Sequence, residues 1–339
     1  MAVRGCLRLP QAGICGREIL DTMNEVTAPY IIRYPAQVPE HLRGGVVSLG
    51  NFDGVHLGHQ QVLAAAKQAG KGLPLTVVSF YPHPVQVLRG ISELRTLSSL
   101  REKREKFAAR GVRLLYGIHF TRDFSRVTAD QFIQRVLVEA LAAKIVVVGE
   151  DVAIGHNREG NLEYLQRALP SYGITLLVVP KLELQGVRPS SRRIRQLLVE
   201  GEVKEAAELL GEPFTVSARV GHGDKRGSKI GFPTANLACR GRLLPKRGVY
   251  ACRVTVKGRS YNAVVNIGVR PTFNGSGERI EVHIPGESLG TLYGERMWVS
   301  FLARLRDERK FSSIEELKTQ IGVDIVEAEK RLRDGHSLA

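Results

Sequence analysis

Two histidines three residues apart, His56 and His59, are the side chains best placed by their spacing to contact a phosphate. They lie in the loop sequence GNFDGVHLGH, residues 50–59. The apolar run Val46–Leu49 before this loop is typical of a buried parallel strand, and the alanine-rich run 60–66 after it is typical of a helix. A strand, a glycine loop and a helix N-terminus collect backbone N–H groups at one point, which suits an anion.

A second basic segment further along the chain would extend this site. Ser190 and Ser191 can cap a helix that begins there, and Arg193 and Arg195 would bring cations to phosphates. The sequence leaves open whether Asn51 and Asp53 shape the loop or lie near a metal ion. The residues expected to bind ATP or its phosphates here are Gly50, Asn51, Phe52, Asp53, Gly54, Gly58, Ser190, Ser191, Arg193 and Arg195, with His56 and His59 catalytic.

Residues 221–236, GHGDKRGSKIGFPTAN, form a second candidate phosphate loop. Its glycines and cations can wrap a polyphosphate, although the P-loop pattern is absent. The residues expected to do so are Gly221, Gly223, Gly227, Lys229 and Gly231. Thr234 and Asn236 offer the hard oxygen ligands that Mg²⁺ prefers.

The elements that position the first loop follow a strand–helix rhythm. Buried strands are expected at residues 74–80, 114–118, 145–149 and 174–179, with helices at about 98–110 and 128–142 between them. This alternation predicts a parallel sheet covered by helices. The histidine loop follows the carboxyl end of a strand, where ligands bind in such sheets.

The pattern changes after a helix that ends at Gly211. Short alternating runs separated by glycine turns predict a small antiparallel barrel or sandwich, followed by a terminal helix from Ser312 to about Arg333. The expected strands are 214–220, 249–256, 261–267, 280–284 and 297–302. We therefore expect an extension at 1–29 that is disordered or untranslated, with Met23 as a candidate start, an α/β domain at 30–211 and a β domain at 212–339.

The composition excludes some classes of protein. The net charge of +15 is scattered along the chain and aromatic residues make up only 6%, so nucleic-acid binding is not expected as the main role. No apolar run approaches the roughly 18 residues that a membrane span needs. The four cysteines form no CxxC pair, which favours free thiols in a reducing cytoplasm.

Both loops resemble known signatures. The GNFDGVHLGH loop is similar to the signature of the HxGH nucleotidyltransferase superfamily, and most similar to that of the bacterial bifunctional riboflavin kinase/FAD synthetase family. Residues 221–236 resemble the riboflavin kinase signature, as do later blocks that include 245–250, 266–273, 281–283, 292–295 and 306–311. The resemblance implies a Rossmann-like N-terminal domain and a C-terminal kinase barrel.

The resemblance also implies two transferase activities with ATP as co-substrate and Mg²⁺ as cofactor. The C-terminal domain would phosphorylate riboflavin to FMN, with Glu281 of the Glu-Val-His block as the catalytic base. The N-terminal domain would adenylylate FMN to FAD and release pyrophosphate. Arg306, Glu308 and Phe311 would bind the flavin. Whether FMN is released between the sites or passed between protomers of a homo-oligomer is left open.

Two departures from the family pattern motivate an alternative. The chain has Val152-Ala153-Ile154-Gly155 where the family has Phe-Arg-Phe-Gly, and Arg192 where the family has threonine. These changes remove an arginine and two aromatic side chains, so one rival is a riboflavin kinase with a weakened adenylyltransferase half. A second rival, motivated by the charge of +15, is an RNA-binding regulator built on a retired enzyme fold.

Overall fold

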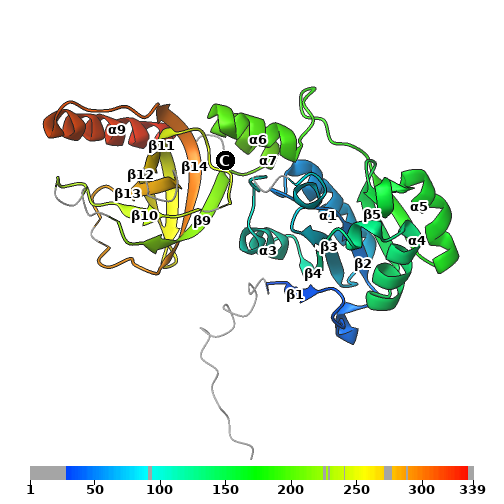
Figure 1. The fold of residues 1–339 in the computed structure, drawn as a ribbon. Helices are drawn as coiled ribbons and strands as arrows, with labels where there is room; N and C mark the ends of the chain where they lie inside the picture. The colour runs from blue at the N-terminus through cyan, green and yellow to red at the C-terminus, as the bar shows by residue number, and fades with distance from the viewer. Residues whose placement is uncertain are drawn as a thin grey trace, which may run out of the picture.

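The computed structural model describes residues 28–90, 94–223, 227, 230–239, 241–270, 277–287 and 289–334. Lys229 and the expected N-terminal extension up to residue 27 lie outside these ranges. An α/β domain and a β-barrel lie beside each other, with two helices, α6 and α7, between them (Figure 1). In the described part of the chain, every helix is too short or too polar to cross a membrane.

The N-terminal domain is built on a six-stranded parallel sheet. The strand order is β1-β4-β3-β2-β5-β8. The strands are β1 (Tyr30–Arg33), β2 (Val46–Leu49), β3 (Leu75–Tyr81), β4 (Val112–His119), β5 (Ile145–Gly149) and β8 (Thr175–Val179). All five strands expected from the sequence are confirmed. The edge strand β1 was not expected, because its four residues are mostly exposed and carry no buried apolar pattern.

Helices cover the sheet as the alternation predicts. They are α1 (Leu57–Gly70), α2 (Pro84–Leu88), α3 (Leu100–Ala108), α4 (Ala129–Phe132) and α5 (Leu162–Ala168). The helix expected at 128–142 begins as α4 and continues as the π-helical segment Ile133–Ala140. A short hairpin is formed by β6 (Ala153–Ile154) and β7 (Gly160–Asn161). Single 3₁₀ turns occur at Glu40–Leu42, Phe124–Arg126, His156–Arg158 and Leu169–Tyr172.

Helices α6 (Ser191–Glu200) and α7 (Val203–Leu210) join the two domains. Ser190 caps α6 by accepting a hydrogen bond from the N–H of Arg193, and α7 ends at Gly211, both as expected. The buried side chains of both helices, such as Ile194 and Leu210, belong to the same apolar cluster as the barrel core. The two helices therefore bury their apolar faces against the barrel, and Figure 1 shows them beside β14 and β9.

The C-terminal domain is a closed antiparallel barrel, which is one of the two architectures that the sequence predicted. The strand order is β10-β13-β12-β11-β14-β9, closed between β9 and β10. The strands are β9 (Phe214–Gly221), β10 (Ala235–Leu237), β11 (Gly248–Val256), β12 (Arg259–Arg270), β13 (Gly277–His283) and β14 (Arg296–Arg306). The three-residue β10 was not expected, because the sequence Pro-Thr-Ala-Asn reads as a turn.

The terminal helix α9 (Ile314–Asp334) packs on the outside of this barrel, as expected. Ala328 and Leu332 of α9 form a small apolar cluster with Val249, Ala251 and other outward-facing strand residues. The barrel thus has an apolar interior and one outer face covered in part by a helix.

Candidate active sites

The histidine loop lies where the sequence places it, between the end of β2 and the start of α1. His56 is the N-cap of α1, and its Nδ1 accepts a hydrogen bond from the N–H of His59 at 3.4 Å. The two imidazole rings stack with centroids 3.7 Å apart. A Cβ on Gly58 would lie 3.3 Å from the His56 ring, a tight contact that would press on the ring.

Both histidines are neutral in this environment. Burial lowers the pKa of His56 to about 4, although Asp53 and Asp151 oppose the shift. Burial, and then the neighbouring His56 and Lys103, hold the pKa of His59 well below its ordinary value. Since Nδ1 of His56 accepts a hydrogen bond, the ring proton resides on Nε2. The pair can therefore donate hydrogen bonds to an anion rather than neutralise it by charge.

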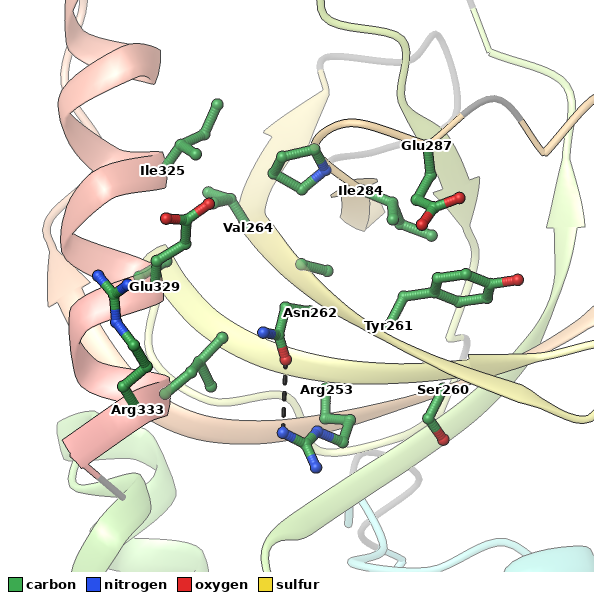
Figure 2. Close-up of a pocket in the computed structure, with 14 residues that line it drawn as sticks. Arg253, Ser260, Tyr261, Asn262, Val264, Ile284, Glu287, Ile325, Glu329 and Arg333 are labelled. Carbon is green, nitrogen blue, oxygen red and sulfur yellow. Dashed lines mark hydrogen bonds between the residues drawn. The ribbon is translucent and has the colours of Figure 1, made fainter. Parts of the chain in front are cut away.

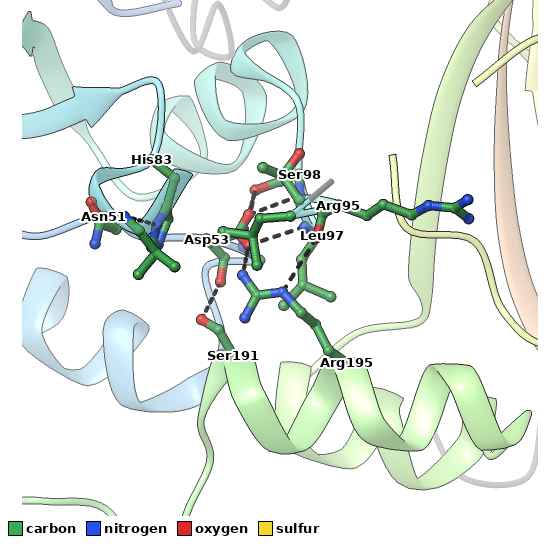
Figure 3. A network of polar contacts seen from close by, with 12 residues as sticks. Asn51, Asp53, His83, Arg95, Leu97, Ser98, Ser191 and Arg195 are labelled. Atoms are coloured by element: carbon green, nitrogen blue, oxygen red, sulfur yellow. Dashed lines mark hydrogen bonds and ion pairs between the residues drawn. The ribbon is translucent and has the colours of Figure 1, made fainter. Parts of the chain in front are cut away.

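Asp53 is the centre of the polar network that holds this loop (Figure 3). Its carboxylate is 1% exposed and accepts hydrogen bonds from the N–H groups of Leu97 and Ser98, each at 3.1 Å. The guanidinium of Arg195, from α6, lies 2.5 Å away. These donors surround both oxygens and tie Asp53 to the backbone at 97–98 and to α6, which fits a loop-shaping role; a role near a metal ion stays an alternative.

Backbone geometry in the loop is strained where the family signature falls. Phe52 and the β-branched Val55 both have positive φ, at 47° and 51°, and both are almost fully buried. Non-glycine residues in this region carry strain, which persists where surrounding contacts hold them and is common at functional sites. Gly54, with φ 84°, sits between them, and a Cβ there would press on Leu97.

Two more polar groups lie at this site, one from α3 and one from the segment after β3. The Lys103 ammonium, from α3, donates to the backbone oxygen of Asn51 at 2.6 Å, and its burial lowers its pKa. His83, the N-cap of α2, is electrostatically coupled to Asp53 and Arg195. The packing of α2 and α3 beside the loop brings these side chains to the site.

Two buried polar atoms in the loop lack a partner within the described part of the chain. They are Oδ1 of Asn51 and Nδ1 of His59. A buried polar atom without a hydrogen bond is costly, and such an atom at a strand end points to a ligand that satisfies it. This observation supports a binding role for Asn51 besides its backbone contacts.

The basic residues expected to contact phosphates separate into two environments. Arg193 is exposed in the first turn of α6, whereas Arg195 is held against Asp53 and the backbone oxygen of Arg95. Ser191 donates to the backbone oxygen of Asp53 at 2.8 Å. Asp151, which follows β5, pairs with Arg188 at 2.9 Å, and both act electrostatically on His56.

The second site lies on the outer face of the barrel and is assembled by strand register. Asn236 of β10 is directly opposite Gly221 of β9 and Glu281 of β13. Glu281 is in turn opposite Asn266 of β12. Directly opposite residues share a face of the sheet, and the adjacent row, Leu237, Ile280 and Ile267, points into the apolar interior. Asn236, Glu281 and Asn266 therefore form one polar row; Asn266 was not among the expected site residues.

Glycines of the second loop pack against this row. A Cβ on Gly223 would overlap the side-chain amide of Asn236, and one on Gly227 would overlap the backbone oxygen of Phe232 and approach Oγ1 of Thr234. Gly231 has φ 90°. Gly223 and Gly227 thus lie close to the amide of Asn236 and the hydroxyl of Thr234, and binding of phosphate and a cation here stays a prediction.

The expected flavin-binding residues lie between the end of β14 and the start of α9. Arg306 donates two hydrogen bonds, at 2.8 and 2.7 Å, to the buried carboxylate of Asp324 in α9. The Arg309 guanidinium lies 4.7 Å from the ring centre of Phe311. Glu308 lies over Gly268, which follows Asn266 by two residues on the same outward face of β12. A Cβ on Gly268 would overlap the carboxylate of Glu308. Glu308 is thereby brought next to the polar row.

A cavity of 590 Å³ opens further along the same outer face, between the strands and the C-terminal half of α9 (Figure 2). Its lining includes Arg253, Tyr261, Asn262, Val264 and Glu329. Arg306, Glu308 and Phe311 do not line it, because they lie near the other end of α9.

Two family models match the chain, one on each domain. Residues 38–193 match the FAD synthetase model, and residues 210–332 match the riboflavin kinase model. The two matches together span the α/β domain apart from its edge strand β1, the barrel and most of α9, and residues 194–209, which make up most of α6 and α7, lie between them.

Curated relatives match over nearly their whole length. The chain is 39% identical over 292 residues to the bifunctional riboflavin kinase/FMN adenylyltransferase of Escherichia coli (strain K12), covering 85% of this chain and 92% of the relative. It is 38% identical to the enzyme of the same name from Pseudomonas fluorescens, covering 86% and 93%. For the enzyme of that name from Listeria monocytogenes, the identity is 40% and the coverage 82% and 90%.

One solved structure has a similar fold over both domains. It is the crystal structure of a protein from Streptococcus pneumoniae described as a macrolide-efflux protein. The TM-score is 0.80 at 33% identity, covering 88% of this chain and 98% of that one.

Proposed function

The chain belongs to the bifunctional riboflavin kinase/FMN adenylyltransferase family, and we propose which of its residues carry each of the two reactions. The enzyme phosphorylates riboflavin to FMN with ATP, and it transfers the adenylyl group of ATP to FMN, which gives FAD. One observation carries the assignment of residues. The polar residues of the two family signatures lie at two separate sites, one between β2 and α1 and the other on β10, β12 and β13.

We place adenylyl transfer at the histidine loop. A phosphate oxygen of FMN forms a bond to the α-phosphorus of ATP, the bond from that phosphorus to the bridging oxygen breaks, and pyrophosphate leaves. FMN already carries an anionic nucleophile, so no general base is needed. The task of the site is to hold two anions together and to stabilise the charge that develops.

The neutral histidines suit this task as hydrogen-bond donors. Nε2–H of His56 and the ring of His59, at the N-terminus of α1, would donate to phosphate oxygens. The otherwise unpaired side-chain oxygen of Asn51 would accept a hydrogen bond from an N–H or O–H group of the nucleotide. The exposed Arg193 would supply positive charge to the leaving pyrophosphate. Arg195 acts through Asp53 in this proposal, and direct contact of Arg195 with phosphate stays a prediction.

We place phosphoryl transfer at the polar row on the barrel. Glu281 would take the proton of the 5′-hydroxyl of riboflavin as its oxygen attacks the γ-phosphorus of ATP, and ADP leaves. The loop glycines, from Gly221 to Gly231, would bring backbone N–H groups to the phosphates. Asn266, on the other side of Glu281, would orient the hydroxyl or the carboxylate.

Thr234 and Asn236 are the residues that would hold Mg²⁺ in this domain. The close approach of Gly223 and Gly227 to these two side chains leaves room for backbone and phosphate but not for a larger side chain, and hydroxyl and amide oxygens are hard donors. When bound, Mg²⁺ would neutralise part of the negative charge of the transferring phosphates. We assign Glu308 and Phe311 to the flavin, with Arg306 fixing their segment to α9 through Asp324.

The domain limits 30–211 and 212–339 remain our proposal for the two catalytic units. The experiment that tests the whole assignment is chromatography of the products formed from riboflavin or from FMN with Mg·ATP. A protein with both sites intact forms FMN and FAD from riboflavin and forms FAD from FMN. Failure to form FAD from FMN would favour the kinase with a weakened adenylyltransferase half.

A further inference from the structure

A five-residue segment, Arg95–Ser99, here called the strap, runs between the histidine loop and the barrel. On one side, the N–H groups of Leu97 and Ser98 donate to the carboxylate of Asp53, and the N–H of Gly54 donates to Oγ of Ser98 at 2.9 Å. Figure 3 shows Leu97 and Ser98 facing Asp53 as Arg195 approaches it from α6. The strap thus fixes the loop that carries the two histidines.

On its other side, the strap is held by an arginine from the barrel domain. Arg242 follows β10, and its guanidinium donates to the backbone oxygen of Leu97 at 2.7 Å and to that of Thr96 at 3.3 Å. The N–H of Leu243 also donates to the oxygen of Thr96 at 3.1 Å. The side chain of Leu97 is buried in the apolar cluster of the barrel and α6–α7.

Helix α3, which begins directly after the strap, repeats this double attachment. The carboxylate of Glu102 is 2% exposed and pairs with Arg242, while it also accepts from the N–H groups of Ser99 at 2.8 Å and Ser217 of β9 at 2.7 Å. One residue on, Lys103 holds the backbone oxygen of Asn51, and Lys106 donates to that of Gly54 at 3.1 Å. The same helix therefore contacts the barrel and the loop.

We propose that Arg242, a residue of the riboflavin kinase domain, is a positioning residue for adenylyl transfer at the other domain. It holds the backbone of the strap, the strap holds Asp53, and Asp53 with Arg195 fixes the loop that presents His56 and His59. Each link is a hydrogen bond or ion pair between neighbouring groups, so the coupling follows one contiguous network. The proposal rests on the assignment of adenylyl transfer to the histidine loop.

Arginine is required at this position because three acceptors are served at once. Its planar guanidinium reaches two backbone oxygens and one buried carboxylate from a single side chain, and lysine offers a point charge without this fork. Loss of the fork weakens the hold on the strap from its barrel side, where the N–H of Leu243 and the packing of Leu97 remain. A displacement of about 1 Å at reacting groups can cost on the order of 100-fold in rate, so even partial release should be measurable.

The test compares Arg242→Met and Arg242→Lys in the full-length enzyme, with Arg219→Met as the matched control. Arg219 is another barrel arginine that donates to a backbone oxygen, that of Gly294, but within its own domain. We expect Arg242→Met to lower kcat for FAD formation from FMN by about tenfold, and Arg242→Lys by less, because partial positioning is retained. Arg219→Met should leave FAD formation unchanged, and all three variants should keep riboflavin phosphorylation within about twofold.

A double variant separates positioning from loss of stability. Arg242→Met alone leaves the Glu102 carboxylate buried without its cation, which destabilises a fold; Glu102→Gln with Arg242→Met removes that buried charge. The proposal expects the double variant to recover thermal stability while FAD formation stays slow. If its FAD formation recovers together with its stability, or if the single variants affect both reactions equally, Arg242 has only a structural role and the proposal is wrong.

The outcome also distinguishes failure of the strap proposal from failure of the site assignment. If His59→Ala abolishes FAD formation but Arg242→Met leaves kcat unchanged, the strap proposal alone is wrong. If His59→Ala itself leaves FAD formation unchanged, the assignment of adenylyl transfer to the histidine loop is wrong. The strap proposal, which rests on that assignment, is then wrong as well.

Discussion

The two active sites are assembled by different kinds of contact. The histidine loop is held by side chains that are distant in the chain: Asp53 meets Arg195 across 142 residues and the strap across about 45. The kinase row is held by main-chain register, since Asn236, Glu281 and Asn266 are consecutive partners on three paired strands. Substitutions far from the reacting groups can therefore disturb the first site, whereas the second site depends on the residues of the row itself.

This difference suggests how the enzyme can carry both reactions in one chain. A closed barrel fixes its outer face without help from the neighbouring domain, because all its strand edges are paired. The histidine loop, with positive φ at Phe52 and Val55, needs outside support, and part of that support comes from the barrel.

Glu281→Gln should abolish the general base and lower FMN formation from riboflavin by about 10³-fold. FAD formation from supplied FMN should stay within twofold, since the row does not contact the histidine loop. Product chromatography measures both. Glu287→Gln, the same change at an exposed residue beyond β13, is the control and should leave both reactions unchanged. Equal loss of the two reactions in Glu281→Gln would contradict separate sites.

His59→Ala should lower FAD formation from FMN by about 10²-fold, because a preorganised donor to the transferring phosphates is lost. Riboflavin phosphorylation should continue at its normal rate. His119→Ala, at an exposed position at the end of β4, is the control. An unchanged rate of FAD formation in the His59 variant would mean that the reaction takes place elsewhere.

Asp53→Asn should reduce FAD formation by about tenfold and lower the free energy of unfolding by about 3 kcal/mol, because it leaves the Arg195 guanidinium without its buried partner. Denaturant unfolding and steady-state kinetics measure the two effects. Glu163→Gln, which removes an exposed partner of Arg167, should change neither by more than the small value of a surface pair. A kinetic defect without loss of stability would argue that Asp53 contacts substrate directly.

Acidification should destabilise the α/β domain through its buried histidines. His56 has a pKa of about 4 when folded and 6.5 as the ordinary value, so the unfolded chain binds protons first as the pH falls. The stability is present above pH 6.5 and is lost towards pH 4, by about 2 kcal/mol between pH 8 and pH 5. Denaturant unfolding at both pH values measures it, and His56→Asn should flatten the dependence. An equally steep dependence in that variant would assign it to other groups.

Arg192→Thr, which restores the family residue, should change FAD formation by less than about threefold. Arg192 is exposed, and the contacts of this helix to Asp53 are made by Ser191 and Arg195. A surface charge away from a packed contact has a small effect. A large gain in this variant would show that the departure from the family pattern weakens the adenylyltransferase.

Local patterns in the sequence predicted the local parts of the structure. The strand–loop–helix unit around His56, the cap at Ser190 and the five longer barrel strands follow from periodicity and capping residues near them in the chain. The edge strand β1 and the three-residue β10 are too short or too exposed to leave a pattern. Val152 packs against the apolar core of the α/β domain, and Ala153 lies in the β6–β7 hairpin. The sequence showed only that the aromatic residues of the family are replaced there, and it did not indicate these positions.

The contacts between distant segments could not be predicted in the same way. Nothing near Lys103 indicates that its ammonium holds the backbone of Asn51, because the contact is made only when α3 packs beside the loop. Helices α6 and α7 were expected from the capping serines and from Gly211, but nothing in the sequence indicated that their apolar side chains would join the barrel core. Such pairings depend on tertiary packing, which a single sequence does not encode as a periodic signal.

The central claim is that two separate sites act in turn on one flavin. It is tested most directly by mixing two full-length variants, each of which is defective at one of the two sites. Glu281→Gln alone should form no FAD from riboflavin, and His59→Ala alone should stop at FMN. We predict that an equimolar mixture of the two full-length variants forms FAD from riboflavin with Mg·ATP, because FMN made at the intact barrel of one molecule is adenylylated at the intact histidine loop of the other. A mixture of folded variants that forms FMN but no FAD, while Glu281→Gln also fails to convert supplied FMN, would contradict the account.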